Sequence, residues 1–373
     1  MDVALLERTL AELKEPRYRA GQVLRWAFGG AGGFEQMTDL PSRLRAQLAT
    51  AVPFTTLSLR RQSQARDGTV KALFATPDGR PLESVLMRYR NGRSSVCLSS
   101  QSGCPLTCTF CATGQMRFGR NLTAWEILDQ VLFFTRLEAS EGRRGPDHAV
   151  FMGMGEPLLN LEAVLEACRR LPEVGIGHRR TAISTVGWIP GIRRLTSEPM
   201  PVRLALSVHA ADDALRSQLM PVNERYPLAD VLSACREYYR RKRRRVFVEY
   251  VMLSGINDAH AQAVALADAL DPRIFKVNLI PYNPTSSQYE GSRPKAIAAF
   301  RSELERRGLT VTVRLERGRE IDAACGQLAA SAPQAMHGAA PVRRIDTPAR
   351  PQNTYGAVDG SALSASHSSS PSG

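Results

Sequence analysis

Short apolar segments alternate with segments of helical periodicity over residues 94–315, and this alternation limits the folds that the chain can adopt. The segments with strand character are 94–99, 148–152, 180–185, 202–208, 246–252, 276–281 and 309–315. Helical stretches lie between them, and the first opens with a capping-box pattern of Thr123 and Glu126. Strands that alternate with helices favour a parallel sheet. Because six or seven units fall short of the eight in a closed barrel, we predict an α/β fold of the incomplete TIM-like barrel type.

Two smaller regions precede this barrel. Residues 1–50 carry apolar side chains at helical spacing in RAGQVLRWAF, which predicts a small helical domain. Residues 51–89 alternate as strands do and contain the turn signal Pro77-Asp78-Gly79, which predicts a β-extension. The barrel core then covers residues 90–330. Ala, Pro, Ser and Gly dominate residues 331–373, and because such a segment buries too little apolar area to offset its chain entropy, we expect a disordered tail.

The net charge of +13 favours a polyanionic partner such as nucleic acid. Residues 331–373 hold three arginines and two aspartates, so an excess of +12 lies on residues 1–330. It is sharpest in REYYRRKRRR, residues 236–245. This block is either a nucleic-acid contact or the solvated end of a helix, and the sequence leaves both interpretations open.

The chain contains no run of eighteen apolar residues, so no membrane span is expected. Its start, MDVALLERTLAELKE, is acidic and amphipathic and lacks the basic region of a signal peptide. We therefore expect a cytoplasmic protein. In that compartment clustered cysteines indicate metal binding or catalysis rather than structural disulfides.

Three cysteines, Cys104, Cys108 and Cys111, form a C-x3-C-x2-C run. Structural zinc usually takes four ligands as two separated pairs, and no second pair follows. Three close thiolates suit a [4Fe–4S] cluster, whose fourth iron stays open for another ligand. With a Phe before the last Cys, the run resembles the radical-SAM signature, in which that iron binds S-adenosylmethionine. A zinc site or a fortuitous cluster is the alternative, and Cys168 and Cys235 are interpreted as core residues.

Polar residues follow several predicted strands, at the end where a parallel barrel carries its chemistry. Glycines such as Gly155 in GMGEP allow close approach of a ligand, and Glu156 is suited to accept from the ammonium group of S-adenosylmethionine. The remaining candidates for cofactor binding are Ser184, Ser207, Val208, His209 and Asn283. Each of these taken singly is also explained as a turn or capping residue.

Seven segments together resemble the RlmN/Cfr family of radical-SAM RNA methyltransferases. They are CLSSQSGCPLTCTFCATG, RNLTAWEI, MGMGEPLLN, LALSVHA, EYVML, NLIPYNP and IDAACGQL, and the resemblance spans residues 5–330. It implies a (β/α)6 radical-SAM barrel, one [4Fe–4S] cluster on the three cysteines, and two S-adenosylmethionine molecules consumed per methylation. The implied product is an adenine of 23S rRNA in the peptidyl-transferase centre, methylated at C2 (RlmN) or C8 (Cfr). RlmN types also methylate C2 of the adenine 3′ of the tRNA anticodon. The N-terminal helices and the IDAACGQL run favour the RlmN type, and methylation at C8 is the alternative.

The resemblance also implies roles for three further residues. Cys325 takes a methyl group from one S-adenosylmethionine, and a radical made from a second molecule removes hydrogen from that methyl, which then adds to adenine. Cys97 matches the thiol that releases the RNA by attacking the sulfur of Cys325, leaving a transient disulfide. Glu83 in PLESV matches a carboxylate that accepts a proton, the alternative being a solvated strand carboxylate.

The implied partners are 23S rRNA, tRNA, an external electron donor and a thiol reductant, with the chain acting as a monomer. The N-terminal helices and the block at 236–245 are the candidates for RNA contacts. Two other classes stay open: a basic RNA-binding module with a structural metal, and a radical-SAM enzyme that acts on protein or small molecules. The pair Cys97 and Cys325 argues against the latter, since that chemistry does not require a second pair of thiols.

Overall fold

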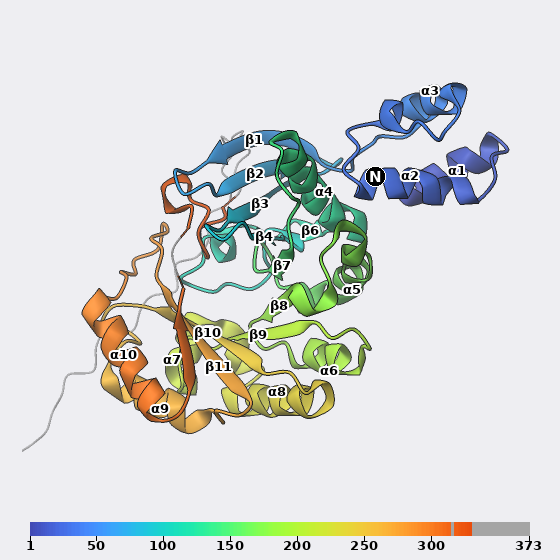
Figure 1. Cartoon of the computed structure of the whole chain (residues 1–373). Coiled ribbons are helices and arrows are strands. Elements are labelled where there is room, and N and C mark those ends of the chain that lie inside the picture. Colours follow the sequence, from blue (N-terminus) through green and yellow to red (C-terminus); the bar gives the residue numbers. More distant parts are fainter. Residues whose placement is uncertain (315–316, 330–373) are drawn as a thin grey trace, which may run out of the picture. The chain divides into compact units, whose positions relative to one another are not determined.

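The computed structural model describes residues 1–314 and 317–329, and the tail predicted for residues 331–373 lies outside this range. Seven neighbouring strands run parallel and follow one another in chain order (Figure 1). They are β4 (Ser94–Cys97), β7 (His148–Phe151), β8 (Thr181–Thr185), β9 (Arg203–Ser207), β10 (Val246–Met252), β11 (Phe275–Pro281) and β12 (Thr310–Val313). Among the described strands β12 pairs only with β11, so the sheet stays open.

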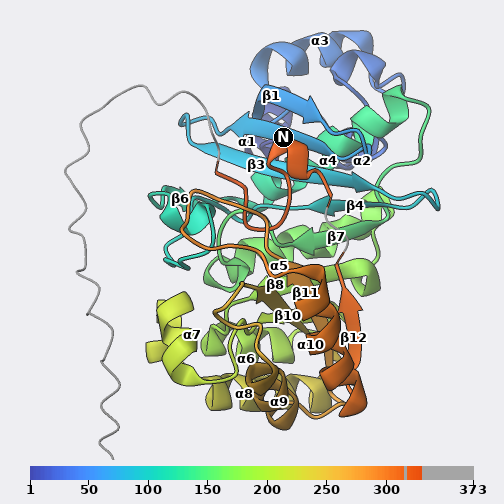
Figure 2. The same cartoon turned by 90° about the vertical axis from the view of Figure 1, so that its left-hand side faces the viewer.

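A helix connects each of these strands to the next. The connecting helices are α4 (Ala124–Ser140), α5 (Leu161–Arg170), α6 (Ile189–Ser197), α8 (Leu228–Lys242), α9 (His260–Ala269) and α10 (Pro294–Arg306), with the short α7 (Asp213–Leu219) preceding α8. The predicted incomplete (β/α)6 barrel is confirmed. Figure 2, turned by 90°, shows α10 lying beside β12.

The first connecting helix illustrates how the sequence sets these elements. Thr123 Oγ1 accepts from the backbone N–H of Glu126, and Glu126 Oε2 accepts from that of Thr123, which completes the predicted capping box. Ile127, Leu128 and Val131 on this helix are fully buried in the barrel core. Burial of one such side chain stabilises the fold by about 1.5–3 kcal/mol, so packing rather than intrinsic propensity holds the helix in place.

The predicted β-extension forms three antiparallel strands, β1 (Ser58–Gln64), β2 (Val70–Ala75) and β3 (Pro81–Arg88). Gly79 has a φ of +78° in the turn between β2 and β3, a conformation that glycine adopts without strain. Strand β3 pairs antiparallel with β4, from Val85 opposite Cys97 to Arg88 opposite Ser94. The extension is therefore a continuation of the barrel sheet, which reaches ten strands in all.

The N-terminal segment forms α1 (Val3–Glu12), α2 (Tyr18–Phe28) and α3 (Ser42–Ala51) around an apolar cluster of its own. The ring of Phe28 lies 6.3 Å from that of Trp125 on α4. Asp129 on α4 accepts from the Met1 amino group at 2.9 Å and from Thr56. These contacts attach the helices to the barrel at α4. Across residues 1–314 and 317–329, no helix is both long and apolar enough to cross a bilayer.

Candidate active site

The carboxyl ends of the parallel strands surround a pocket of about 150 Å³. Five of the residues predicted for cofactor binding line it: Gly155, Glu156, Ser184, Ser207 and His209. Cys111 and Cys325 lie in its wall as well. The structure thus brings together predicted residues from the ends of three neighbouring strands, β7, β8 and β9, as the barrel prediction requires.

Two of the predicted residues do not line this pocket. Val208 is fully buried in the core, with its backbone N–H donated to Glu249 and its carbonyl oxygen accepting from Arg216. Asn283 lies in an adjoining hollow, where its Nδ2 donates to the carbonyl oxygen of Cys325 at 3.3 Å. The Oδ1 atom of Asn283 is buried and has no hydrogen-bond partner among the described residues, so it is free to accept from a ligand.

The glycines of GMGEP are required by close packing. Gly155 has a φ of +96°, and a Cβ there would lie 2.5 Å from the side chain of Gln101. The same Gln101 accepts from the backbone N–H of Glu156 at 2.8 Å, which fixes the loop after β7.

Glu156 is buried and its carboxylate joins two loops. It accepts from the backbone N–H of Leu158 at 3.1 Å and from that of Val186 at 3.0 Å. Burial raises the pKa of Glu156 to about 7 despite these bonds. Each carboxylate oxygen can accept more than one hydrogen bond, so Glu156 retains capacity for a ligand in the pocket.

His209 enters the pocket as a neutral ring. Its Nδ1 accepts from the backbone N–H of Val251 at 3.0 Å, which leaves Nε2 as the protonated nitrogen. Burial, followed by the charge of Arg216, lowers the pKa of His209 to about 3. The ring of Phe110 packs edge-on against it with the centroids 4.7 Å apart.

The three clustered cysteines lie on the loop between β5 (Gln101–Ser102) and β6 (Arg120–Asn121). Cys108 is buried, and Cys104 and Cys111 are half-buried. Burial raises the pKa of Cys104 to about 12 and also raises the pKa values of Cys108 and Cys111, with neighbouring thiols adding to the shift of Cys108. Coordination to an iron centre reverses this balance, because it deprotonates a thiol.

The donor set fits a [4Fe–4S] cluster. Among residues 1–314 and 317–329, no three His, Cys, Asp or Glu side chains stand close enough to bind one metal ion. A cluster makes a different demand, because each thiol binds its own iron and the cluster lies between them. Three soft thiols on one loop, beside a pocket that can admit a ligand for the fourth iron, meet that demand.

Cys97 and Cys325 meet in a small hollow beside the pocket. Met152, Asn283 and Arg314 also line this hollow, and both thiols are free. Burial raises the pKa of Cys97 to about 12, the proximity of Cys325 adds to the shift, and the positive charge of Arg314 opposes it. The two thiols come from opposite ends of the barrel sequence, Cys97 from the end of β4 and Cys325 from the segment after β12.

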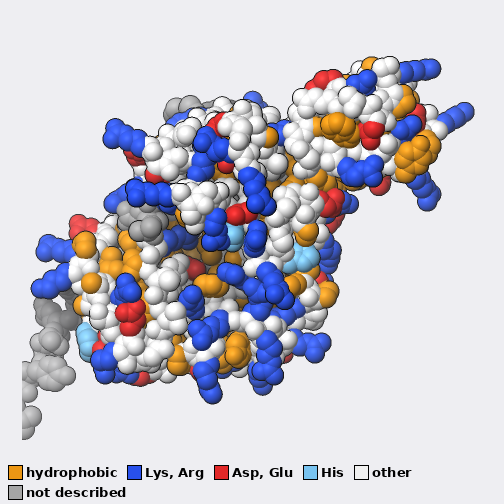
Figure 3. Space-filling model, in the orientation of Figure 1, with side chains coloured by type: hydrophobic (Ala, Val, Ile, Leu, Met, Phe, Trp, Pro, Cys, Tyr) orange, Lys and Arg blue, Asp and Glu red, His pale blue; other side chains and the backbone are white. Residues whose placement is uncertain are grey.

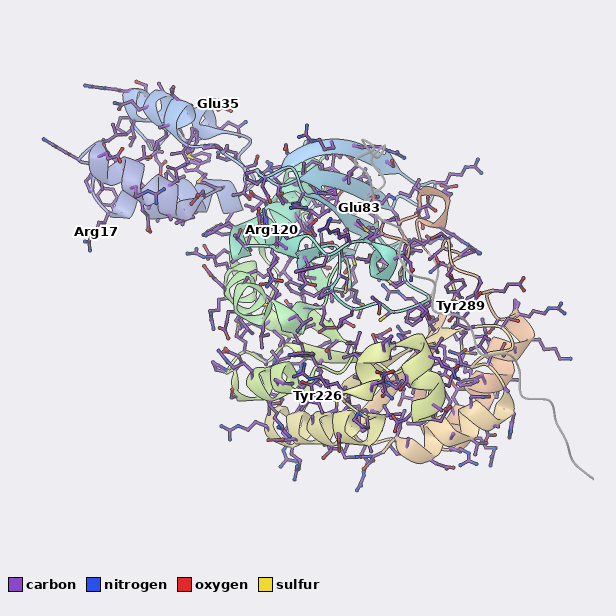
Figure 4. The ribbon with its side chains drawn as sticks, turned by 180° about the vertical axis from the view of Figure 1, so that it is seen from behind. Arg17, Glu35, Glu83, Arg120, Tyr226 and Tyr289 are labelled. Atoms are coloured by element: carbon purple, nitrogen blue, oxygen red, sulfur yellow. The ribbon has the colours of Figure 1, made fainter. Side chains whose placement is uncertain are left out.

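Glu83 lies elsewhere. It is buried on β3, with Oε1 3.1 Å from Lys71 Nζ and Oε2 accepting from the backbone N–H of Ala329 at 3.1 Å (Figure 4). The hollow that it lines with Lys71 and Asp322 is separate from both cavities that Cys325 lines. The structure therefore places Glu83 outside the two cavities that Cys325 lines. It is buried rather than solvated, and it contacts the segment that carries Cys325.

Known proteins of similar sequence and structure agree with the chemistry that this site suggests. Residues 98–267 match the model of the radical SAM superfamily, and residues 1–52 match that of the ribosomal RNA large subunit methyltransferase N-terminal domain. A probable dual-specificity RNA methyltransferase RlmN of Thermus thermophilus is 44% identical over 337 residues, which cover 89% of this chain and 94% of that protein. The protein of the same name from Chloroflexus aurantiacus is 46% identical over 340 residues, 87% of this chain and 90% of the relative.

The chain belongs to the RlmN family of radical-SAM RNA methyltransferases. The crystal structure of a radical SAM methyltransferase from Sphaerobacter thermophilus superimposes with a TM-score of 0.84 at 45% identity, covering 89% of this chain and 98% of that one. As a member of the RlmN family, this chain is an RNA methyltransferase that uses a [4Fe–4S] cluster and S-adenosylmethionine.

Sequence reasoning missed three charged residues of this RlmN-family site. Arg314 and Glu249 line the pocket from the strand regions that were predicted at 309–315 and 246–252. A single charge within an apolar strand is the signal that was available for both. Arg216 on α7 is fully buried and donates to the carbonyl oxygens of Val186 at 2.7 Å and Ser207 at 3.2 Å, so it holds the ends of β8 and β9 together.

Proposed function

We propose that this RlmN-family enzyme methylates C2 of an adenine in the peptidyl-transferase centre of 23S rRNA, and C2 of the adenine 3′ of the anticodon in tRNA. The observation that carries the proposal is the meeting of Cys97 and Cys325 in one hollow beside the pocket. A ring carbon of adenine is a poor nucleophile toward a sulfonium methyl group, whereas a thiolate is a competent one. An enzyme that carries the methyl group on a thiol first therefore overcomes the main chemical difficulty.

In this proposal Cys104, Cys108 and Cys111 hold the cluster, and Gly155, Glu156, Ser184, Ser207 and His209 contact S-adenosylmethionine. When bound, the cluster and this cofactor supply the radical that activates the methyl group on Cys325. Asn283 fixes the backbone of Cys325 through its Nδ2 and offers its buried Oδ1 to S-adenosylmethionine. Val208 contributes to cofactor binding through its backbone, whose carbonyl oxygen accepts a hydrogen bond from Arg216.

Cys97 completes the cycle. The ring carbon first loses its proton. The Cys97 thiolate then attacks the sulfur of Cys325, and the bond from that sulfur to the new carbon breaks with its electron pair staying on the carbon, which takes up a proton to become the methyl group. A Cys97–Cys325 disulfide remains for an external thiol to reduce. Arg314 supports this step, because its charge favours the thiolate form of Cys97. The carboxylate of Glu83 acts in this scheme by holding Ala329, and hence the Cys325 segment, in place.

Mass spectrometry of nucleosides tests the product. The reconstituted enzyme is incubated anaerobically with S-adenosylmethionine, a reductant, and either 23S rRNA or tRNA that lacks the modification. We expect 2-methyladenosine from both RNAs. Formation of 8-methyladenosine instead would show that the enzyme methylates C8. Absence of product from tRNA would show that tRNA is not a substrate.

Metal analysis tests the cofactor in the same preparation. We expect about four irons per chain in the wild type and a loss of most of them in Cys108→Ala, since a site with two thiols binds the cluster weakly. Cys168→Ala is the matched control. That thiol is fully buried on α5, so its removal should leave the iron content unchanged. Zinc in place of iron would favour the RNA-binding module with a structural metal.

A further inference from the structure

Another hollow, of about 600 Å³, opens at the amino-terminal ends of the barrel strands. Its lining consists of seven basic side chains together with Pro201 and Phe247, and no acidic side chain takes part. We call it the basal basin; its basic residues are Arg179, Arg203, Lys242, Arg243, Arg244, Arg245 and Lys276. In Figure 3, Lys and Arg side chains gather on the face drawn over β8, β9 and α8.

The fold explains why these cations meet. Arg203 opens β9, and Phe247 and Lys276 are the second residues of β10 and β11. Residues 243–245 form the link from α8 to β10. Parallel strands begin at one edge of a sheet and end at the other, so the basal basin and the active-site pocket lie at opposite ends of the same strands.

Within the part of the chain that the structure describes, the basal basin concentrates positive charge with little compensation, since only Lys242 feels the charge of a nearby carboxylate, that of Glu198. None of its seven cations forms an ion pair with a carboxylate of the described chain. Arg203 and Lys276 lie over the ring of Phe247, at 5.8 and 5.9 Å from its centroid. Burial, followed by the charges of Arg244 and Arg93, lowers the pKa of Arg203. Like charges facing one hollow repel each other, and a bound polyanion relieves that repulsion.

We propose that the basal basin binds the phosphate backbone of an RNA segment remote from the target adenine. The inference rests on the proposed function, which supplies RNA as the polyanion. Guanidinium groups pair with phosphate oxygens through two hydrogen bonds, and the ring of Phe247 holds Arg203 and Lys276 together at the centre of the basin. This combination of cations and an aromatic ring is typical of surfaces that follow a nucleic-acid backbone.

The distance between the two sites determines what kind of RNA can use both. Phe247 lines the basal basin and Val251 lines the active-site pocket, about 13 Å further along β10 at the rise of an extended strand. The backbone that flanks an adenine in the pocket has to pass around the barrel wall to reach the basin. A large folded RNA can supply such a second segment, whereas a short hairpin bound at the pocket cannot. The basal basin therefore selects for size of substrate and adds affinity without touching the reacting atoms.

A binding experiment with two RNAs tests this inference. The basin variant combines Arg203→Gln, Arg244→Gln and Lys276→Gln. The control variant combines Lys295→Gln, Arg301→Gln and Arg306→Gln, which removes the same formal charge from exposed positions on α10. Dissociation constants are measured by filter binding for protein-free 23S rRNA and for a short hairpin that carries the target adenine, over a range of salt concentrations.

We expect the basin variant to bind 23S rRNA about tenfold more weakly than wild type, with the slope of log K against log salt reduced by about two to three. Its affinity for the hairpin should stay within twofold of wild type, and the control variant should match wild type on both RNAs. Equal weakening on both RNAs, or an rRNA affinity equal to that of the control, would overturn the inference.

Two further measurements separate the possible reasons for failure. Arg245→Gln alters one exposed side chain of the basal basin and should weaken rRNA binding about twofold to threefold with an unchanged melting temperature, which excludes misfolding as the cause. Nucleoside analysis of the wild-type reaction reports on the proposed function independently. If methyladenosine forms and the basin variants bind rRNA as wild type does, the proposed RNA binding by the basal basin is wrong while the proposed function stands.

Discussion

The backbone N–H of Ala112, the residue after the last clustered cysteine, donates to the carbonyl oxygen of Gly326, the residue after Cys325, at 2.8 Å. One position further along, Thr113 Oγ1 donates to the carbonyl oxygen of Leu328. The loop proposed to hold the cluster and the segment proposed to carry the methyl group are therefore hydrogen-bonded side by side. One backbone bond and one side-chain bond thus fix their relative position.

Removal of either thiol of the pair should give a different failure. Cys325→Ala should abolish methylation without trapping RNA, because no thiol is left to carry the methyl group. In Cys97→Ala the carbon carried by Cys325 should still bond to the adenine, but no thiol is left to break its bond to the sulfur of Cys325. A covalent protein–RNA adduct should therefore accumulate. Denaturing gel electrophoresis with labelled RNA detects that adduct. Cys235→Ala, which alters a fully buried thiol on α8, is the control and should turn over normally.

Normal turnover of Cys97→Ala without an adduct would contradict the mechanism in which Cys97 releases the RNA from Cys325. An adduct formed by Cys325→Ala would contradict the assignment of Cys325 as the methyl carrier.

Substitutions at Glu83 distinguish positioning from proton transfer. Glu83→Gln keeps an oxygen that can accept from the Ala329 N–H, so we expect single-turnover methylation within about tenfold of wild type, the net value of one hydrogen bond being about 1 kcal/mol. Glu83→Ala removes that acceptor and leaves Lys71 without its buried partner, so a clearly larger loss is expected. A general base would instead lose about 10²–10⁴ in rate with either substitution. Equal and severe losses in both variants would restore the sequence-based prediction.

Gly155→Ala should impair binding of S-adenosylmethionine. The new Cβ would sit at a φ of +96° and collide with Gln101, which positions the N–H of Glu156. Strain of about 1–3 kcal/mol is expected, and it falls on the pocket itself. Gly79→Ala is the matched control, since its φ is +78° but a Cβ there meets nothing within 4 Å. Calorimetric titration should show weaker binding only for the Gly155 variant, while both variants melt at a lower temperature.

His209 should make the stability of the protein depend on pH. Its pKa is about 3 in the folded chain against 6.5 when unfolded, so the unfolded state binds more protons between these values and stability is lost as the pH falls through them. Between pH 6.5 and pH 5 this amounts to about 2 kcal/mol. His209→Asn is the suitable comparison, because Asn tolerates the residue's φ of +58° and can accept from Val251. Urea unfolding at both pH values should give the smaller pH dependence for the variant; identical dependence in both proteins would show that His209 is not the titrating group.

The sequence predicted the strands well where apolar runs are short and bounded, and β10 has the same limits, 246–252, as predicted. It did not predict that β3 pairs with β4, because strand pairing across a turn depends on register, which composition does not encode. Arg314 was hidden for a related reason. Whether a charged side chain in a strand points inward depends on the alternation of that strand within the sheet, which becomes visible only once its neighbours are in place.

The candidate site divides in the same way. Residues in loops after strands, such as Glu156 and Ser184, could be found because the barrel brings all such loops to one rim. Cys97 and Cys325 could be paired only through the family resemblance. Glu83 was predicted as a proton acceptor through the same resemblance. Its buried contacts with Lys71 and Ala329 suit a positioning role, and the role of proton acceptor stays a prediction.

The hydrogen bond from the Ala329 N–H to Glu83 determines which fragments of this enzyme can keep the Cys325 segment in place. The segment with Cys325 is fastened on one side to the loop of Ala112 and on the other to β3, a strand that precedes the barrel. A barrel excised at residue 90 would keep its three clustered cysteines and its pocket but would lose one of the two anchors of the proposed methyl carrier. The β-extension thus supports the proposed reaction centre, and we expect a functional fragment of this enzyme to begin before residue 90.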